Sequence, residues 1–260
     1  SYEPAITLQN GHTVHIPLDS PDYRPDWQRV AAAITPRTRV IMINTPHNPT
    51  GAVWGADDLQ ALEQLVIRHG LYVIADEVYE HIVFDGRRHE SVCRYPGLYE
   101  RSFVISSLGK TYHVTGWKIG YCVAPRDLTV EFRRIHQYVT FTSITPVQLG
   151  LADYLSAHPE HHRGLGSFYQ QKRDLFIRLL EGSRFTLRPS GGTYFQLLDY
   201  SAITDEPDLG LAKRWTESAG VASIPLSVFY QQAPGDRLLR FCFAKADSTL
   251  EKAAEKLCRL

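Results

Sequence analysis

The sequence predicts an α/β protein with a mostly parallel β-sheet, flanking helices and a smaller C-terminal α+β domain. Compact apolar runs at residues 39–44, 71–75 and 103–107 have the length and composition of buried parallel strands. An amphipathic helix is expected at residues 57–69, between the first two runs, which gives the order of a right-handed βαβ unit. After Gly182 strands and helices no longer alternate in this way, which predicts a second unit.

Local signals place the remaining elements of the N-terminal part. The dipeptide Asn10-Gly11 predicts a turn, Asp26 is suited to begin a helix, and Gly70 is suited to end one. The elements expected here, in order, are a short helix from residue 4, a strand at 14–18, a short helix at 26–34, and a fourth sheet strand at 119–124 that pairs with its predecessor.

The C-terminal part is expected to contain more helix. Its elements, in order, are helical regions at 128–155 and 161–180, a pair of strands at 185–187 and 193–198 around a Pro-Ser-Gly-Gly turn, a helix at 208–219, a strand at 238–243 and a helix at 248–257. The predicted boundary divides the chain into a large domain at residues 1–157 and a small domain at residues 158–260.

Composition and charge exclude several classes of protein. The 260 residues include 28 Lys and Arg against 28 Asp and Glu, so the zero net charge predicts neither nucleic acid nor an anionic membrane as a partner. No apolar run approaches the ~20 residues of a membrane span, and the N-terminus lacks a signal-peptide pattern. We therefore expect a soluble, cytoplasmic protein.

The cysteines and histidines predict no metal site. Four scattered cysteines without a Cys-x-x-Cys pair indicate reduced, mostly buried thiols rather than a disulfide framework or a zinc site. His161 and His162 have no partner at metal-ligand spacing, so a solvated helix face is expected there.

The strand at residues 103–107 leads into a stretch rich in glycine and hydroxyl groups that contains Lys110 and Lys118. The carboxyl end of a buried parallel strand is where α/β sheets bind ligands. Burial disfavours the charge of an amine, and a neutral amine is the form that reacts with an aldehyde. From this stretch alone, however, a surface lysine just past a strand is the simpler interpretation of Lys110.

Three successive strand ends carry polar side chains that should face one crevice. Asp76 lies at the second of these strand ends, and burying its carboxylate is costly unless it meets a cation or several hydrogen-bond donors. A protonated pyridine nitrogen is a suitable cation. Asn48 and Tyr79 can both donate to a phenolate oxygen. Ser107 and Lys118 can bind a phosphate, and Lys110 supplies the amine.

Four ordered motifs resemble the signature of the class I/II aminotransferases, fold-type I enzymes that depend on pyridoxal 5′-phosphate (PLP). The motifs are Asn48-Pro49-Thr50-Gly51, Asp76-Glu77-Val78-Tyr79, Ser107-Leu108-Gly109-Lys110 and Gly116-Trp117-Lys118-Ile119-Gly120. The longer strings NTPHNPTG, ADEVYEHIVFDG and SSLGKTYHVTGWKIGYCVAP are most similar to the subgroup of methionine aminotransferases, kynurenine aminotransferases and glutamine transaminase K. The resemblance continues through GGTYFQLLDYS, GVASIPLSVF and LLRFCFAK, and so covers essentially the whole chain.

The resemblance implies a role for each matching residue. The catalytic set would be Lys110, Asp76 and Tyr79: the lysine attaches the cofactor and then moves a proton, and the aspartate pairs with the pyridinium. Asn48 and Tyr79 would bind the ring oxygen. Ser107 and Lys118 would hold the phosphate, the lysine standing where many relatives have arginine.

The substrate would be held by Arg240 together with Asn48, since Arg240 matches the arginine that binds the substrate carboxylate in the family. Without the resemblance, an arginine in an apolar strand would be expected to lie on an edge strand or to form a structural ion pair. Tyr112 and His113, just after Lys110, either line the site or pack elsewhere.

The implied activity is transfer of an amino group from methionine or an aromatic or other hydrophobic amino acid to a 2-oxo acid, in a homodimer. A C–S β-lyase on the same scaffold remains an alternative, because the motifs do not separate the two reactions. A non-catalytic alternative is the PLP-binding half of a transcription regulator or an inactive PLP-binding fragment. The regulator is disfavoured because no basic DNA-binding helix is present.

Family members carry a longer segment before the point that corresponds to Ser1. That segment holds a turn that binds the cofactor phosphate and an aromatic residue that stacks on its ring. We therefore expect a fold that is incomplete at the N-terminus, and a chain that is the C-terminal portion of a longer protein.

Overall fold

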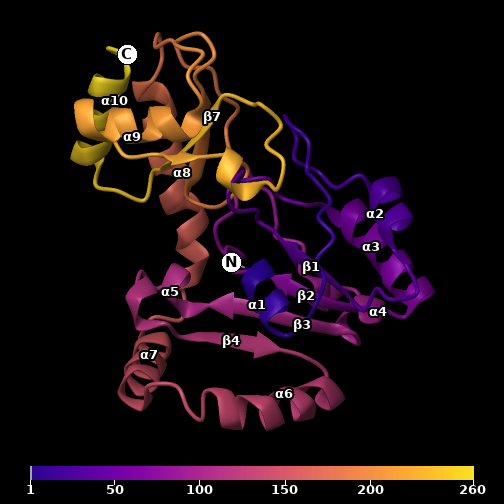
Figure 1. The fold of residues 1–260 in the computed structure, drawn as a ribbon. Coiled ribbons are helices and arrows are strands. Elements are labelled where there is room, and N and C mark those ends of the chain that lie inside the picture. The colour runs from indigo at the N-terminus through magenta and orange to yellow at the C-terminus, as the bar shows by residue number, and fades with distance from the viewer. Residues whose placement is uncertain (1) are drawn as a thin grey trace.

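Figure 1 shows the computed structural model, which describes residues 2–260 as two sheets with helices around each. The first sheet contains, in spatial order, β1 (Val40–Asn44), β2 (Tyr72–Asp76), β3 (Ser102–Ser107) and β4 (Gly120–Val123). The first three strands are parallel, and β4 pairs antiparallel with β3. The predicted α/β architecture with a mostly parallel sheet is confirmed, as is the pairing of the fourth strand with its predecessor.

Helix α3 (Ala56–His69) makes the crossover between β1 and β2 and supplies much of the core of this half. Leu62 and Val66 are fully buried in one cluster with Val73 of β2. The helix ends at Gly70, whose φ of 64° is a left-handed conformation that glycine adopts without strain. Two shorter helices, α2 (Trp27–Ala33) and α4 (Pro96–Tyr99), pack against α3.

The second sheet is antiparallel and smaller, which confirms the predicted α+β unit. Its strands, in spatial order, are β5 (Phe195–Asp199), β7 (Leu238–Cys242) and β6 (Ile224–Pro225). Helices α8 (His161–Leu179), α9 (Asp208–Ser218) and α10 (Asp247–Leu257) lie around it (Figure 1).

Helix α8 and a shared apolar core join the two halves. The helix runs from the level of the first sheet to the second (Figure 1). The largest buried cluster contains Ile82 and Phe84, which follow β2, together with Tyr169 and Phe176 of α8 and Phe243 beyond β7. This cluster contains residues from both sides of the predicted boundary at residues 157 and 158, and it therefore fixes the second sheet beside the strand ends of the first. The domain boundary itself stays a prediction.

One predicted feature of the N-terminal part is wrong, and one of the central part is confirmed only in part. Residues 14–18 form no strand; His15 lies 3.3 Å from Glu3 of α1 (Tyr2–Leu8), and the Leu18 carbonyl accepts from Tyr230 at 3.2 Å. The helical region at 128–155 is two helices, α6 (Arg126–Val139) and α7 (Thr145–Ala157). Phe141, with a φ of 66°, interrupts them.

The predicted strand pair at 185–187 and 193–198 is confirmed only in part. Thr186 forms an antiparallel bridge with Asp199, the last residue of β5, but residues 185–187 form no strand and β5 pairs along its length with β7. The main-chain N–H groups of Gly191 and Gly192 both donate to the Gly51 carbonyl at 3.0 Å. The glycine pair therefore binds a loop of the first sheet and does not form a tight hairpin turn. Strand β6, which the sequence analysis missed, has only two residues and no alternating pattern.

The remaining elements are short. They are α5 (Leu108–Thr111) and 3-10 turns at Val92–Arg94, Thr115–Trp117 and Ser227–Phe229. All four cysteines are free, but Cys93 and Cys258 are exposed, so the expectation of mostly buried thiols is wrong. No helix within residues 2–260 has the length and apolar character needed to cross a membrane.

Candidate active site

The carboxyl ends of β1 and β2 lie side by side and are joined by Asn44. Asn44 and Asp76 are register partners, and Asn44 Nδ2 donates to the Asp76 main-chain oxygen at 2.9 Å. Asn44 Oδ1 accepts from the main-chain N–H of Asn48 at 2.9 Å. The loop that carries Asn48 is thereby fixed against the strand end that carries Asp76.

The Asp76 carboxylate is half-buried and holds two donors. Its Oδ1 accepts from the main-chain N–H of Val78 at 3.2 Å, and its Oδ2 accepts from the Tyr2 hydroxyl of α1 at 2.5 Å. Burial, and then the Asp76 charge, raise the pKa of Tyr2 far above its ordinary value, so the phenol keeps its proton and acts as the donor.

Tyr79 is buried one turn beyond Asp76. Its ring meets Tyr194 and Phe195 edge to face, with centroid separations of 5.3 and 6.0 Å. Burial is the main cause that raises the pKa of Tyr79 well above its ordinary value, followed by the neighbouring Tyr194. The Tyr79 hydroxyl is therefore protonated at neutral pH and available as a hydrogen-bond donor.

Lys110 follows directly from the end of β3. Ser107 ends the strand, and its Oγ accepts from the Gly109 N–H at 3.1 Å, which begins the single turn α5. That turn places the half-buried Lys110 with its Nζ 5.9 Å from the centre of the Tyr194 ring. Tyr194, on the segment just before β5, thus neighbours both the amine of Lys110 and the ring of Tyr79.

The pairing of β3 with β4 brings the segment that carries Lys118 close to Ser107. Ser107 is opposite Gly120, and the Leu108 N–H donates to the Ile119 carbonyl at 3.1 Å. Lys118 itself is exposed and has a left-handed φ of 56°. Within residues 2–260 no hydrogen bond or ion pair holds the amino groups of Lys110 and Lys118, so both are available to a ligand.

Arg240 reaches the same strand ends from the second sheet. Its guanidinium donates to Asn48 Oδ1 and lies against the faces of Phe195 and Phe229, at 4.0 and 5.4 Å from the ring centres. Burial lowers the pKa of Arg240, although a guanidinium remains charged throughout the physiological range. The two halves of the chain therefore meet at Arg240 and Asn48.

The structure excludes both simpler interpretations of Arg240. β7 is the central strand of its sheet, between β5 and β6, so Arg240 does not lie on an edge strand. Among the ion pairs of residues 2–260, none involves Arg240. Its charge has no carboxylate partner, and its neighbours are an amide oxygen and two aromatic rings.

Two residues of this region were missed by the sequence analysis. Tyr2 lies 74 positions from Asp76, and neither composition nor spacing links them. Tyr194 belongs to the string GGTYFQLLDYS, whose resemblance to the family is a signal, but the position of its ring beside Lys110 depends on the packing between the two sheets.

His161 does not lie on a solvated helix face, so that expectation is wrong. Its Nε2–H donates to the Thr111 carbonyl at 3.1 Å, and its Nδ1 pairs with the Tyr154 hydroxyl at 3.1 Å. Tyr112 stacks on the His161 ring at 5.0 Å, and the His113 Nδ1 is 3.1 Å from the Tyr169 hydroxyl. Tyr112 and His113 therefore pack against α7 and α8 and hold the turn that carries Lys110 in place.

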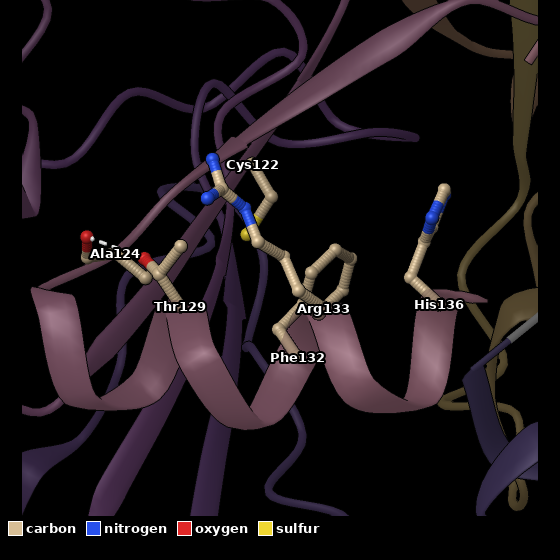
Figure 2. A pocket seen from close by; sticks show the side chains of 6 residues that line it. All are labelled: Cys122, Ala124, Thr129, Phe132, Arg133 and His136. Atoms are coloured by element: carbon tan, nitrogen blue, oxygen red, sulfur yellow. Dashed lines mark hydrogen bonds between the residues drawn. The ribbon is translucent and has the colours of Figure 1, made fainter. Parts of the chain in front are cut away.

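Figure 2 shows a pocket of about 250 Å³ that is separate from these groups. It lies between the end of β4 and α6, and its lining residues are Cys122, Ala124, Thr129, Phe132, Arg133 and His136. Thr129 donates to the Ala124 carbonyl at 3.0 Å inside it. None of the predicted site residues lines this pocket, so it is not the candidate active site.

The side chains gathered at the strand ends form a distinctive donor and acceptor set. The members are one carboxylate, one amide, one phenol, one hydroxyl, two amines and one guanidinium, from Asp76, Asn48, Tyr79, Ser107, Lys110, Lys118 and Arg240. Within residues 2–260 no group of three or more His, Cys, Asp or Glu side chains is arranged to hold a metal ion. The set suits an organic ligand with a ring N–H, anionic oxygens and an electrophilic carbon.

The chain resembles known proteins over its full length. Residues 1–257 match the family "Aminotransferase class I and II". The methionine aminotransferase of Escherichia coli is 50% identical over 260 residues, which is all of this chain and 67% of that protein. A kynurenine–oxoglutarate transaminase of Dictyostelium discoideum is 36% identical over 265 residues, covering 93% of this chain and 61% of that protein.

Solved structures give the same result. The crystal structure of YbdL from Escherichia coli, described as a methionine aminotransferase, superposes with a TM-score of 0.97 at 49% identity over all of this chain and 68% of its own. A single mutant of the aspartate aminotransferase of Thermus thermophilus superposes with a TM-score of 0.87 at 30% identity over all of this chain and 66% of its own.

Proposed function

Because this chain belongs to the class I and II aminotransferase family, we propose that it transfers the amino group of methionine, or of an aromatic or other hydrophobic amino acid, to a 2-oxo acid, with PLP as its cofactor. The observation that carries the proposal is the hydrogen bond from Arg240 to Asn48. It brings a guanidinium, which would bind the substrate carboxylate, to the loop after β1, beside the strand ends that carry Asp76 and Lys110.

The donor and acceptor set fits PLP. When bound, this cofactor supplies an aldehyde for an amine and a protonated aromatic ring that withdraws electrons from the substrate α-carbon. The Asp76 carboxylate would accept a hydrogen bond from the ring N–H. Its two existing donors occupy one lone pair on each oxygen, so further lone pairs are free. Ser107 and Lys118, joined through the β3–β4 pairing, would bind the phosphate.

Asn48 and Tyr79 would both donate to the ring oxygen. The Asn48 Oδ1 already accepts from Arg240, so its Nδ2 remains free to donate. The raised pKa of Tyr79 keeps its phenol protonated for the same purpose. Two donors at one ring oxygen stabilise its negative charge and fix the ring in its plane.

Lys110 would attach the cofactor and then act as the base that takes the proton from the substrate α-carbon. The turn α5, capped by Ser107, delivers its amine to the end of β3. Arg240 would bind the substrate carboxylate through two parallel N–H groups. Phe195 and Phe229, against which its guanidinium lies, would line the path of an apolar side chain.

The test supplies purified protein and PLP with methionine and a 2-oxo acid acceptor, and measures the 2-oxo acid of methionine by mass spectrometry. A second arm uses S-methylcysteine, from which transamination gives a 2-oxo acid that keeps its sulfur, whereas β-elimination gives pyruvate and methanethiol. We expect the sulfur-containing 2-oxo acids in both arms. Pyruvate and thiol as the main products would contradict the proposal in favour of a lyase.

We also propose that the protein acts as a homodimer, the assembly that the family resemblance implies. Large apolar side chains on α6 and α7 are exposed, among them Ile135, Val139 and Leu149, and their burial against further protein would stabilise an assembly. Light scattering is expected to give twice the chain mass, and a monomeric mass at micromolar concentration would contradict this.

A further inference from the structure

The contact between Tyr2 and Asp76 is not explained by apolar packing. Helix α1, which lies over the first sheet at the centre of Figure 1, contributes no buried residue to the core. The Tyr2 side chain is 42% exposed, yet its hydroxyl points inward to Asp76 Oδ2 at 2.5 Å. The polar contact, rather than burial of the ring, fixes this tyrosine at the site.

The two oxygens of the Asp76 carboxylate are held by donors from different parts of the chain. The Val78 N–H holds Oδ1 from the chain of Asp76 itself, and the Tyr2 hydroxyl holds Oδ2 from a helix 74 residues earlier. With only the first donor, rotation about the bond to the carboxyl group would exchange the two oxygens at little cost. With both donors, each oxygen keeps one position and one remaining direction for a further partner.

Helix α1 is itself positioned by polar contacts that flank Tyr2. Glu3 lies 3.3 Å from His15, and its other oxygen accepts from Gln231 at 3.5 Å, in the loop before β7. The phenol is therefore presented to Asp76 by a helix that is tied to the second half of the chain. This is the arrangement expected of a group whose function depends on its position.

We propose that Tyr2 is a positioning residue that holds the Asp76 carboxylate in the orientation needed to accept from the ring N–H of the bound cofactor. The inference rests on the proposed function, because it assumes that Asp76 binds the pyridine nitrogen of PLP. Tyr2 itself need not touch the reacting atoms; it acts through the carboxylate that it holds.

The experiment compares the wild-type protein with Tyr2→Phe, which removes only the hydroxyl, and with Tyr138→Phe as the matched control. Tyr138 is 85% exposed on α6, far in sequence from the site. We measure the dissociation constant of PLP by visible absorbance, the visible circular dichroism of the bound cofactor, and the thermal unfolding of the cofactor-free protein. The circular dichroism reports the orientation of the ring, which a merely structural change elsewhere would not alter.

For Tyr2→Phe we expect PLP binding that is weaker by about tenfold, a reduced visible dichroism and unchanged thermal unfolding, as for loss of one hydrogen bond to a charged acceptor. Tyr138→Phe should change none of the three. In an Asp76→Ala background, Tyr2→Phe should have no further effect on the dissociation constant, because the group through which it acts is gone.

The outcomes separate the two proposals. If wild-type protein binds no PLP, the proposed function fails and this inference fails with it. If wild type binds PLP but Tyr2→Phe matches it in affinity and dichroism, only the role of Tyr2 is overturned. The same holds if Tyr2→Phe lowers the unfolding temperature in step with the affinity, or if it weakens binding equally in the Asp76→Ala background.

Discussion

Arg240 shows how neighbouring side chains shape what one charge can bind. The central carbon of its guanidinium lies 4.0 Å from the centre of the Phe195 ring while one N–H donates to Asn48, so the other donors of this planar group remain for a ligand. An ammonium group has the same charge but neither the flat face nor the paired donors. The shape of the group, rather than its charge alone, should therefore decide how well it binds a carboxylate.

We predict that Arg240→Lys raises the KM for the amino acid by about ten- to a hundredfold and changes kcat much less, because a bidentate contact to the substrate carboxylate is replaced by a single one. Steady-state kinetics with methionine and a fixed 2-oxo acid measure both constants. A fall in kcat with unchanged KM would show that Arg240 acts on the chemical step and not on carboxylate binding.

Gly51 is a second residue whose identity the fold requires. Its φ is 72°, and a Cβ there would lie 2.5 Å from the Ser190 Cβ and 3.0 Å from the Gly192 carbonyl. The glycine therefore permits the close approach of the loop after β1 to the segment before β5. This approach brings Asn48 and Arg240 together.

We predict that Gly51→Ala lowers the free energy of unfolding by about 2 kcal/mol or more, from backbone strain together with the clash. Gly164→Ala is the matched control, because a Cβ at this position in α8 meets nothing within 4 Å. There the free energy of unfolding should rise by about 0.5–1 kcal/mol through helix propensity. Urea unfolding measures both, and equal effects of the two substitutions would contradict the assignment.

At the scale of elements, the turn α5 depends on α8 for its position. His161, the first residue of α8, donates to the carbonyl of Thr111, the last residue of α5, and accepts from Tyr154 of α7. The turn that carries Lys110 is only four residues long and could not hold its geometry alone. The histidine thus links the reactive lysine to the helix that joins the two halves.

We predict that His161→Ala lowers the free energy of unfolding by about 1–3 kcal/mol, because the buried Thr111 loses the donor to its carbonyl and the Tyr112 ring loses its stacking partner. His12→Ala, at an exposed position, is the control and should change it by less than about 0.5 kcal/mol. Chemical denaturation of both variants tests this. An unchanged free energy of unfolding in His161→Ala would show that α5 is held by other contacts.

At the scale of the whole molecule, histidines with lowered pKa values make stability depend on pH. Burial lowers the pKa of His47 to about 4, and it also lowers the pKa of His81 and His113. The unfolded chain takes up a proton at His47 as pH falls below about 6.5, whereas the folded chain does so only near pH 4. The stability due to neutral His47 is therefore complete above about pH 6.5 and is lost as pH falls toward 4.

We predict that the free energy of unfolding falls between pH 7 and pH 5, with about 2 kcal/mol of the fall due to His47. The substitution His47→Asn should remove that part of the pH dependence and leave the part that is due to other groups. Urea unfolding at the two pH values measures the difference for each protein. An identical difference in wild type and variant would contradict the assignment to His47.

Much of the fold could be predicted from the sequence because its strongest signals are local. The apolar runs of β1, β2 and β3 and the amphipathic face of α3 are each complete within fewer than 15 residues, and the structure confirms all of them. The hairpin expected at residues 185–198 is confirmed only at the bridge between Thr186 and Asp199, for the opposite reason. Gly191 and Gly192 bind Gly51, which is 140 residues away in the chain, and no local pattern shows such a partner.

The residues of the candidate site also divide into those that could be predicted from the sequence and those that could not. The polar residues at the ends of β1, β2 and β3 could be predicted, since strand ends of a parallel sheet meet at one edge. Arg240 was placed by resemblance alone, and its neighbours Asn48 and Phe229 became visible only once the second sheet was in position. Tyr2 and Tyr194 reach the site through packing across the whole molecule, and spacing in the sequence does not show this.

The most direct test of the central claim is a single turnover without an acceptor. Wild-type protein loaded with PLP and freed of excess cofactor is mixed with methionine, and the 2-oxo acid of methionine is quantified by mass spectrometry against the number of sites. We predict close to one equivalent of 2-oxo acid per site, and none from Lys110→Ala. Absence of the 2-oxo acid from loaded wild type, or an equal yield from Lys110→Ala, would contradict the assignment of these strand ends as a transamination site.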